Sequence, residues 1–377
     1  MAEVRLENLT KLYGRKRAVS DVSVTCREGE FFSIFGPTGA GKSTILKMIA
    51  GIEEVTSGKI YFNGRAVNDL PPQERNVSMA FESYNLYPHL NVYDNIAFPL
   101  RAPRWGLNLT REEERRRVEE IADFLGIGEL LERLPQHLSG GQKQRVSLSR
   151  ALVRKPEVYL LDEPIAHLDA RLKFSTQTLL KEFAAKYRAT IIYVTHDYRE
   201  ALALSDRIVV LRKGSIEQEG RPEEIYYTPK TDFVGRLIGE PPMNLIDGEI
   251  GDEKGKTLFK VGGLFAVPVR DKLLDAMKKA ERRENGKAVT RLGIRCEYIT
   301  ISKKKISESS FELPVYAIVH EAESSVVTFQ LGDTFLYVRA REEKGFCDYC
   351  LNEKVWLEFD PDHMYFFPKT MEITSKS

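Results

Sequence analysis

The segment Gly36-Pro37-Thr38-Gly39-Ala40-Gly41-Lys42-Ser43 matches the pattern G-x-x-x-x-G-K-[ST], in which a loop surrounds phosphate groups. Its glycines let the backbone turn tightly and direct several N–H groups into one concavity at the start of a helix. Lys42 is expected to reach the outer phosphates of a nucleotide, and the hydroxyl of Ser43 to bind Mg²⁺. A strand pattern at 31–35 precedes the loop and a helical pattern at 44–50 follows it, so the motif has the context that phosphate binding needs.

Composition limits the class of protein. The chain has 377 residues, which suggests more than one domain, and 56 Lys and Arg balance 55 Asp and Glu, which gives no support to a nucleic-acid partner. No apolar run is long enough for a transmembrane helix, and the N-terminus lacks the basic and apolar regions of a signal peptide. We therefore expect a cytosolic protein, whose work at a membrane would need another chain.

Alternating strand and helix patterns predict an α/β domain with a largely parallel sheet. Residues 3–9 and 19–26 are predicted to be edge strands, and about 82–155 a helical subdomain, in which Thr110-x-x-Glu113 is a capping box. Further strands are expected at 58–64, 76–81, 158–162, 190–195, 207–211 and 215–219, and helices at about 141–153, 170–186, 198–204, 222–227 and 231–238.

Short strand patterns follow Pro241-Pro242, which marks a probable change of domain in the sequence pattern. Turn signals at Gly262-Gly263 and Gly332-Asp333 separate them, so we predict an all-β domain, most simply a small barrel. The charged run 278–287 is expected to be a helix end and an exposed loop. Strands are expected at 257–261, 264–269, 289–295, 298–302, 313–320, 325–331, 334–341 and 354–359.

Two acidic residues, Asp162 and Glu163, end the apolar strand 158–162. A carboxylate at the carboxyl end of a strand beside a phosphate loop can hold Mg²⁺ through water. The next carboxylate can polarise the water that attacks a γ-phosphate. Two acids after a strand are weak grounds by themselves, but they become strong together with the phosphate loop.

A second anion site is predicted where Ser139-Gly140-Gly141-Gln142 opens the helix near 141–153. With the phosphate loop, this segment resembles the signature of the ATP-binding-cassette (ABC) ATPases. In that family two cassettes pack head to tail, and the signature of one closes on the γ-phosphate held by the other. The resemblance implies a P-loop ABC ATPase domain at 1–240 and an OB-type transport-associated regulatory domain at 241–377.

The resemblance also implies roles for single residues. Tyr13 matches the aromatic residue that stacks on adenine, His196 the histidine that senses the γ-phosphate, and Asp169 an aspartate that contacts the opposite cassette. Glu163, His196 and Glu82 are expected to act in hydrolysis, and Ser43, Glu82 and Asp162 to hold Mg²⁺. The residues expected to bind ATP are Tyr13, Gly36, Pro37, Thr38, Gly39, Ala40, Gly41, Lys42, Ser43, Thr44, Asp162, Ser139, Gly140, Gly141, Gln142 and Asp169.

Two positions depart from the family pattern. Glu82 stands where the family usually has a Gln that touches Mg²⁺ and the attacking water, and Ala166 stands where many members have Ser. Glu82 keeps an oxygen ligand but adds a negative charge and loses an amide donor, so we expect altered rather than abolished hydrolysis. Both departures leave open a cassette that works beside a non-identical partner.

Segments 82–89 and 95–100 are similar to importer cassettes of the maltose and glycerol-3-phosphate type, as are Pro241-Pro242-Met243-Asn244 and Gly293-Ile294-Arg295. In those proteins the first two segments form a groove for a coupling helix of the membrane permease. The resemblance implies a peripheral protein on the cytoplasmic face of the inner membrane, paired with a second ABC subunit and served indirectly by a solute-binding protein, without nucleic acid.

Three functions remain to be compared. The favoured one is an ATPase, with ATP and Mg²⁺ as cofactors, that powers an importer for a carbohydrate, polyol or glycerol-type solute. A weakly hydrolytic regulatory cassette beside a different ATPase is the alternative, and a ribosome- or nucleic-acid-directed ABC ATPase is disfavoured by the single cassette. Cys347-x-x-Cys350 suggests zinc, but no second ligand pair exists, so two incidental cysteines are the better explanation.

Overall fold

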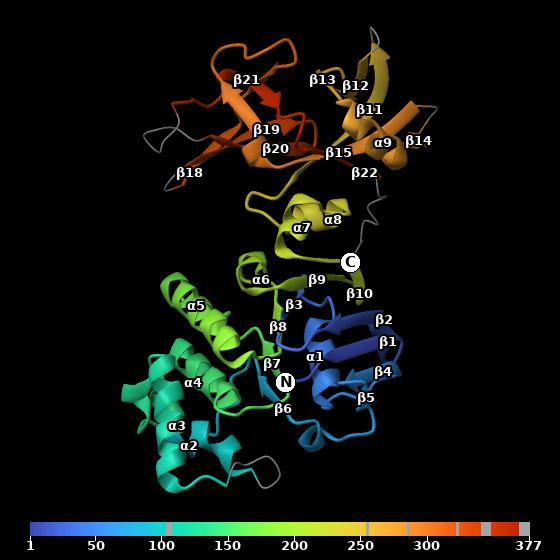
Figure 1. Cartoon of the computed structure of the whole chain (residues 1–377). Coiled ribbons are helices and arrows are strands. Elements are labelled where there is room, and N and C mark those ends of the chain that lie inside the picture. Colours follow the sequence, from blue (N-terminus) through green and yellow to red (C-terminus); the bar gives the residue numbers. More distant parts are fainter. Residues whose placement is uncertain (103–107, 254–255, 285–286, 322–323, 341–347, 369–377) are drawn as a thin grey trace. The chain divides into compact units, whose positions relative to one another are not determined.

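The computed structural model describes residues 1–102, 108–253, 256–284, 287–321, 324–340 and 348–368 (Figure 1). The chain divides into two units, Met1–Thr228 and Pro229–Ser377. The boundary drawn from the sequence lies later, between 240 and 241. The difference is explained by α8 (Asp232–Leu237), which joins the second unit through an ion pair of Asp232 with Arg291 at 2.8 Å.

The central sheet of the first unit has the strand order β10-β9-β3-β8-β7-β6. β3 (Phe31–Phe35), β7 (Val158–Asp162) and β8 (Ile191–Thr195) are parallel and buried along their whole length, which is why their sequences are continuous apolar runs. Phe35 pairs with Thr195, and Asp162 pairs with Val194. The segments that follow these three strands therefore meet at one edge of the sheet.

The remaining strands of this sheet lie at its two sides. β9 (Arg207–Arg212) is parallel to β3, β6 (Val77–Ala80) is parallel to β7, and β10 (Ser215–Gly220) forms an antiparallel edge. The predicted mostly parallel sheet with an antiparallel edge is confirmed.

The N-terminal hairpin belongs to another sheet, so the prediction of edge strands at 3–9 and 19–26 was wrong. β1 (Val4–Tyr13) and β2 (Lys16–Cys26) pair with each other, and β1 pairs with β4 (Ser57–Phe62) in an antiparallel sheet of order β2-β1-β4-β5. Alternating burial identifies a half-buried strand but not its partner, which explains the error. α1 (Lys42–Ala50) lies between the two sheets and shares a hydrophobic core with both (Figure 1).

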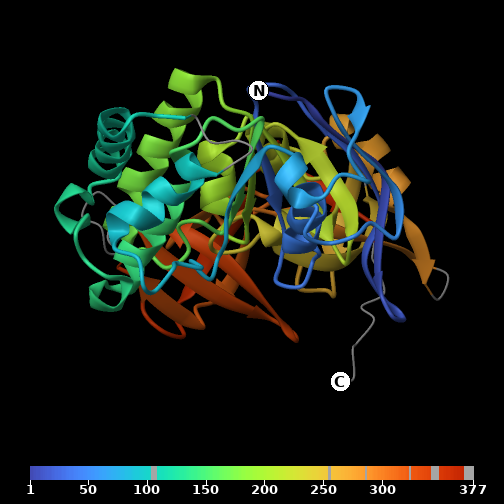
Figure 2. The same ribbon diagram turned by 90° about the horizontal axis from the view of Figure 1, so that it is seen from below.

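The predicted helical subdomain is confirmed by α2 (Val92–Ala97), α3 (Arg111–Phe124) and α4 (Gly140–Leu152), which follow β6. α3 starts with the predicted capping box, in which the N–H of Thr110 donates to Glu113 Oε2 at 2.8 Å and the N–H of Glu113 donates to Thr110 Oγ1 at 3.2 Å. Figure 2 shows these helices on the side of the first unit opposite to β1 and β2. Their apolar faces join the core that covers the other face of the central sheet.

The second unit is built mainly from antiparallel strands, with the helix α9 (Asp271–Ala280) beside them. The strands predicted at 325–331 and 354–359 are β19 and β21, whereas the run 313–320 forms two strands, β17 and β18. Two strands were not expected: β11 contains Asp, Gly and Glu and is ordered by pairing with β12 and β15, and β22 pairs with β15. The strands are β11 (Asn244–Glu253), β12 (Lys256–Val261), β13 (Phe265–Pro268), β14 (Arg282–Glu284), β15 (Lys287–Ile294), β16 (Ile299–Ser302), β17 (Phe311–Pro314), β18 (Ala317–His320), β19 (Ser325–Leu331), β20 (Thr334–Ala340), β21 (Lys354–Phe359) and β22 (Met364–Phe367).

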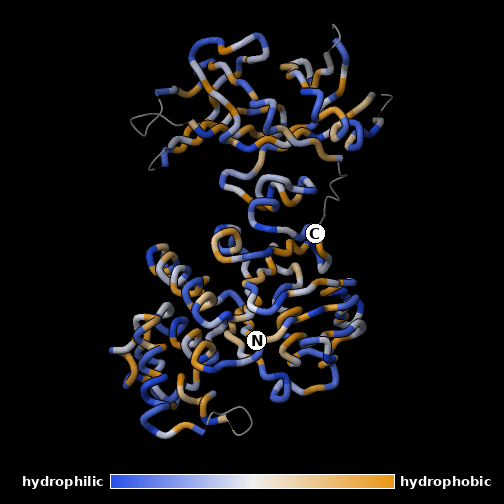
Figure 3. The backbone as a smooth tube through the Cα atoms, viewed as in Figure 1, coloured by the Kyte–Doolittle hydropathy of each residue, from blue (hydrophilic) through white to orange (hydrophobic). Residues whose placement is uncertain are grey.

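Hydrophobic residues gather on the central strands of the first unit, and many loops are hydrophilic (Figure 3). None of the helices in the described ranges combines the length and the hydrophobicity that a bilayer span requires. The other elements are α5 (Ala170–Tyr187), α6 (Tyr198–Leu204), α7 (Pro222–Tyr227), β5 (Arg65–Ala66) and the 3₁₀ turns Pro72–Glu74, Phe98–Arg101, Gly128–Leu130, Pro135–His137 and Cys296–Tyr298.

Candidate active site

The predicted phosphate loop connects β3 to α1, and close backbone contacts dictate its glycines. A Cβ atom at Gly36 would lie 2.5 Å from the carbonyl oxygen of Leu211, and one at Gly41 would lie 2.5 Å from that of Ala18. Gly41 also has a φ of 101°, which side-chain-bearing residues rarely adopt. The loop therefore needs glycine at these positions to keep its shape at the start of the helix.

Lys42 is only 6% exposed and folds back over the loop. Its Nζ donates to the carbonyl oxygens of Gly36 at 2.9 Å and Pro37 at 3.1 Å, and lies 3.9 Å from Glu163 Oε1. Burial lowers the pKa of Lys42, and the carboxylates of Glu163, Asp162 and Glu82 oppose that effect. An anionic ligand in the loop would add to their support of the charged ammonium.

Ser43 and Asp162 lie side by side because their elements adjoin in the fold. The Ser43 hydroxyl donates to Asp162 Oδ1 at 2.9 Å. Burial raises the pKa of Asp162, and the hydrogen bond from Ser43 opposes the rise. A hydroxyl beside a buried carboxylate is a pair of hard oxygen donors, the kind that Mg²⁺ prefers.

Glu163 is held in a strained backbone conformation directly after β7. Its φ is 47°, and its N–H donates to the carbonyl oxygen of Val194 at 2.9 Å. Such a conformation costs about 1–3 kcal/mol and persists only where surrounding contacts determine it. The result is that Glu163 Oε2 accepts a hydrogen bond from His196 Nδ1 at 2.8 Å.

A cavity of about 610 Å³ joins these groups. It brings together Tyr13, Glu82, Glu163, His196 and the phosphate loop from Thr38 to Thr44, which are far apart in the sequence. Three exposed cations at its rim were not singled out from the sequence. They are Lys16, Arg17 and Lys213, and the position of the first two directly after Tyr13 was the signal that could have identified them.

Two of the predicted residues reach this cavity from exposed positions. Tyr13 ends β1 and is 44% exposed, with the Lys11 ammonium 5.0 Å from its ring centroid. One ring face can therefore meet a flat apolar ligand. Glu82 is exposed, and its charge acts on both Lys42 and Asp162.

The signature-like segment and Asp169 lie outside the described lining of this cavity. Ser139 caps α4: its Oγ accepts from the N–H of Gln142 at 3.3 Å, and Gln142 Oε1 accepts from the N–H of Ser139 at 2.9 Å. Asp169 caps α5 by accepting from the N–H groups of Arg171 and Leu172, both at 3.1 Å. Within one chain, both segments are ordered helix starts.

Gln144 is a residue that sequence reasoning missed. It is 3% exposed; its Nε2 donates to the carbonyl oxygen of Glu163 at 3.2 Å, and its Oε1 accepts from the N–H of His167 at 3.1 Å. One amide therefore joins α4, which begins at Ser139, to the segment that carries Glu163. A polar residue on the buried face of α4, one turn before Leu148, was the available signal.

His196 is held in place by a buried network around Glu200. Glu200 is 2% exposed, and its Oε2 accepts from the hydroxyls of Tyr193 and Thr195, both at 2.8 Å. Its Oε1 accepts from Lys173 Nζ on α5 at 3.0 Å. Burial raises the pKa of Tyr193 well above its ordinary value, so this hydroxyl remains a donor. The network ties α5 and α6 to the end of β8, where His196 begins the next turn.

We expect Glu200→Ala to lower the free energy of unfolding by about 2–4 kcal/mol, because it leaves two buried hydroxyls and an ammonium without their acceptor. ATP turnover should fall as His196 loses its support, with little change in nucleotide affinity. Urea unfolding and steady-state turnover measure the two effects. Glu200→Gln, which keeps an accepting oxygen, should lie between the wild type and Glu200→Ala; equal stability of all three would contradict this account.

Among the described residues there is no cluster of three or more His, Cys, Asp or Glu side chains positioned to hold a metal ion. Cys347 of the Cys347-x-x-Cys350 motif lies outside the described residues, and Cys350 is an exposed free thiol. Any divalent cation at the nucleotide site would therefore need ligands from the nucleotide as well as from Ser43 and Asp162.

Comparison with known proteins places these features in one family. The family model described as ABC transporter matches residues 19–166. The trehalose/maltose import ATP-binding protein MalK of Thermococcus litoralis is 46% identical over 259 residues, which cover 67% of this chain and 68% of that protein. The oligosaccharides import ATP-binding protein MsmX of Bacillus subtilis is 37% identical over 377 residues, which cover 99% of both chains.

A solved structure agrees with the fold of the first unit. It is the dimeric structure of a post-hydrolysis state of the ATP-binding cassette MJ0796 bound to ADP and Pi. The TM-score is 0.54 at 33% identity, and the match covers 58% of this chain and 98% of that one.

Proposed function

The chain belongs to the ABC transporter family of ATP-binding proteins, and from this membership we infer that it hydrolyses ATP to power an importer for a carbohydrate, polyol or glycerol-type solute. The observation that carries the proposal is the convergence of Lys42, Ser43, Asp162, Glu163 and His196 at the ends of three adjacent parallel strands. Relatives named for maltose, oligosaccharide and glycerol-3-phosphate import support the solute class.

The geometry assigns each residue a task in hydrolysis. The loop N–H groups and the Lys42 ammonium hold the phosphates and balance their charge. Glu163 accepts a proton from the attacking water or orients it, since its carboxylate lies at the mouth of the loop, 3.9 Å from Lys42. The hydrogen bond from His196 fixes the direction of that carboxylate and leaves the other face of the ring toward the cavity.

Ser43 and Asp162 are the residues that fit Mg²⁺, because a hydroxyl oxygen and a buried carboxylate oxygen are adjacent and the latter lacks a cationic partner within 4 Å among the described residues. Mg²⁺ would neutralise the charge that develops between the phosphates. Glu82 lies near enough to influence the charge of both Lys42 and Asp162, so it supports a third oxygen ligand.

A second cassette completes the site in this proposal. Ser139, Gly140, Gly141, Gln142 and Asp169 lie outside the described lining of the chain's own nucleotide cavity, although they form a second anion-binding helix start. The dimeric form of the related cassette supports their use against a nucleotide held by the partner subunit. Ala166 would reduce one contact in that pairing.

The permease is proposed to dock on the segment that joins β6 to α2. Phe98 is 47% exposed, and its ring centroid lies 4.6 Å from that of Tyr87. The buried side chain of Asn95 orders this segment: its Oδ1 accepts from the N–H of Tyr87 at 2.8 Å and its Nδ2 donates to the carbonyl oxygen of Leu90 at 2.9 Å. A rigid, partly exposed aromatic surface suits an apolar helix of a membrane subunit.

The same proposal gives the protein its place in the cell and its indirect partners. Because the described helices include no membrane span, attachment to the cytoplasmic face of the inner membrane would depend on permease subunits. A solute-binding protein would deliver the cargo to those subunits. Copurification from native membranes tests this: permease chains with two cassettes support it, whereas recovery with ribosomes and without a membrane protein would refute it.

We expect Glu82→Gln to raise ATP turnover by roughly three- to tenfold or to shift its Mg²⁺ requirement, because it removes a negative charge near the phosphates and restores an amide donor. Steady-state turnover across a Mg²⁺ titration measures both effects. Glu54→Gln, a change of an exposed carboxylate outside the described cavity lining, is the matched control. Turnover and Mg²⁺ dependence that both stay as in the wild type would exclude a role for Glu82 at the metal.

A further inference from the structure

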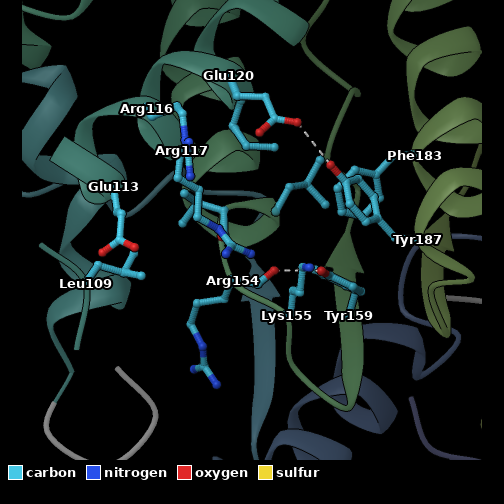
Figure 4. Close-up of a pocket in the computed structure, with 13 residues that line it drawn as sticks. Leu109, Glu113, Arg116, Arg117, Glu120, Arg154, Lys155, Tyr159, Phe183 and Tyr187 are labelled. Carbon is cyan, nitrogen blue, oxygen red and sulfur yellow. Dashed lines mark hydrogen bonds between the residues drawn. The ribbon is translucent and has the colours of Figure 1, made fainter. Parts of the chain in front are cut away.

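A second cavity lies in the first unit, apart from the nucleotide cavity and with different lining residues (Figure 4). It encloses about 170 Å³, and its walls come from α3, the connection from α4 to β7, β7 itself and α5. A single water needs only roughly 10–15 Å³ by this measure, so a small molecule has room there.

Cationic side chains dominate the polar wall of this cavity. Arg116 and Arg117 of α3 and Lys155 after α4 line it. Within the described parts of the chain, Arg116 and Lys155 have no carboxylate oxygen within ion-pair distance, and Arg117 uses its Nε to donate to the carbonyl oxygen of Val153 at 2.7 Å. Three cations therefore face one space without direct neutralisation.

A fourth cation, Arg154, also borders the cavity but is engaged elsewhere. Its Nη2 donates to Asn76 Oδ1 at 2.5 Å, and its side chain extends away from the other cations in Figure 4. Its carbonyl oxygen accepts from the Tyr159 hydroxyl at 2.7 Å, which fixes the floor of the cavity.

The two acids at the cavity are occupied by other groups. Glu113 Oε2 accepts from the N–H and from the hydroxyl of Thr110, both at 2.8 Å, in the capping box of α3. Glu120 Oε1 lies 3.3 Å from the Tyr187 hydroxyl and 3.5 Å from Lys186 Nζ. Neither carboxylate is placed to neutralise Arg117 or Lys155.

Aromatic rings form the opposite wall. The ring centroids of Phe183 and Tyr187 are 4.8 Å apart, and those of Tyr159 and Phe183 are 5.4 Å apart with the rings edge to face. Figure 4 shows Phe183 and Tyr187 across the cavity from Arg116 and Arg117. One side of the cavity thus suits an anion and the other an apolar or aromatic body.

We propose that this cavity is an effector site for a small phosphate monoester, whose phosphate lies among Arg116, Arg117 and Lys155 and whose organic part lies against Phe183 and Tyr187. A phosphate dianion matches three neighbouring cations better than a monovalent carboxylate, and guanidinium groups bind its oxygens in pairs.

The position of the cavity gives a bound effector a route to the nucleotide site. α4 begins at Ser139 and α5 begins at Asp169, and the cavity lies beside the later parts of both helices. A ligand there would join α3 to α5 in addition to the hydrogen bond from Arg117 to Val153. This effector role rests on the proposed ATPase function, whereas binding itself does not.

Calorimetric titration of the full chain with phenyl phosphate tests the site, with the nucleotide cavity first saturated with ADP so that the phosphate loop cannot compete. We expect saturable binding below about 10 mM, weakened about tenfold or more in the double variant Arg116→Gln, Lys155→Gln. These two side chains have no printed structural hydrogen bond to lose. Arg115→Gln, a neighbouring exposed change on α3, is the matched control and should bind as the wild type does.

Competition separates the sources of the phosphate group. Inorganic phosphate that displaces phenyl phosphate at similar concentration identifies a phosphate site, and weaker competition shows that the aromatic wall contributes. Absence of saturable binding, or equal binding by the double variant, would overturn the proposal. Because this titration involves no turnover, it is independent of the ATPase; a change of twofold or more in turnover on adding phenyl phosphate, absent from the double variant, then tests the effector role.

Discussion

ATP hydrolysis falls at least about a hundredfold when Glu163 is replaced by Gln, while ATP binding is retained. The carboxylate is the group placed to accept a proton from water: it lies at the end of β7, fixed by His196 at 2.8 Å and by the strained backbone at φ 47°. The amide keeps the size of the side chain and one accepting oxygen but cannot take up the proton. Single-turnover hydrolysis and a separate binding titration measure the two properties.

The retained binding has a further consequence for pairing. A variant that binds ATP without hydrolysing it should accumulate the closed pair of cassettes, because ATP is no longer lost from the interface. Size-exclusion chromatography with light scattering measures this as a larger dimer fraction at saturating ATP. Glu182→Gln, an exposed change on α5, is the matched control. Hydrolysis by Glu163→Gln at the wild-type rate would refute the assignment of Glu163.

Lys42→Ala weakens ATP binding by about a hundredfold or more, because it removes the buried cation that faces the phosphates. Lys42 also donates to the carbonyl oxygens of Gly36 and Pro37, so the variant leaves the loop without two hydrogen bonds. Some loss of stability is therefore expected, and a circular-dichroism melt separates it from the loss of affinity. Equilibrium titration with a fluorescent ATP analogue measures the affinity.

The control for this prediction is Lys59→Ala on β4, which removes an exposed cation away from the described cavity lining. It should bind ATP as the wild type does. A folded Lys42→Ala protein with unchanged affinity would show that the loop N–H groups alone hold the phosphates and that Lys42 is not needed for binding.

Local sequence was sufficient wherever the chemistry depends on neighbours along the chain. The phosphate loop, the capping boxes at Thr110 and Ser139, and the helix over 170–187 all follow from spacing within one turn or one strand. The continuous apolar runs of β3, β7 and β8 also predicted burial on both faces. For this reason the fold class and the main site motifs could be read before any contact was known.

Other features depend on partners that are distant in sequence and could not be predicted from local patterns. The N-terminal hairpin pairs with β4 rather than with the central sheet, and β11 is ordered by its neighbours despite a weak strand pattern. Strand pairing is a long-range choice, so periodicity shows that a strand exists without showing where it lies.

The candidate site follows the same division. The sequence by itself determined the loop, the acidic pair Asp162-Glu163 and the signature-like helix start. Only the tertiary structure brought His196 to Glu163, placed Gln144 between α4 and the Glu163 segment, and buried Glu200 beneath the turn of His196. Motif residues are set by the chemistry of a short stretch, whereas the groups that orient them come from packed elements whose proximity arises only when the whole core forms.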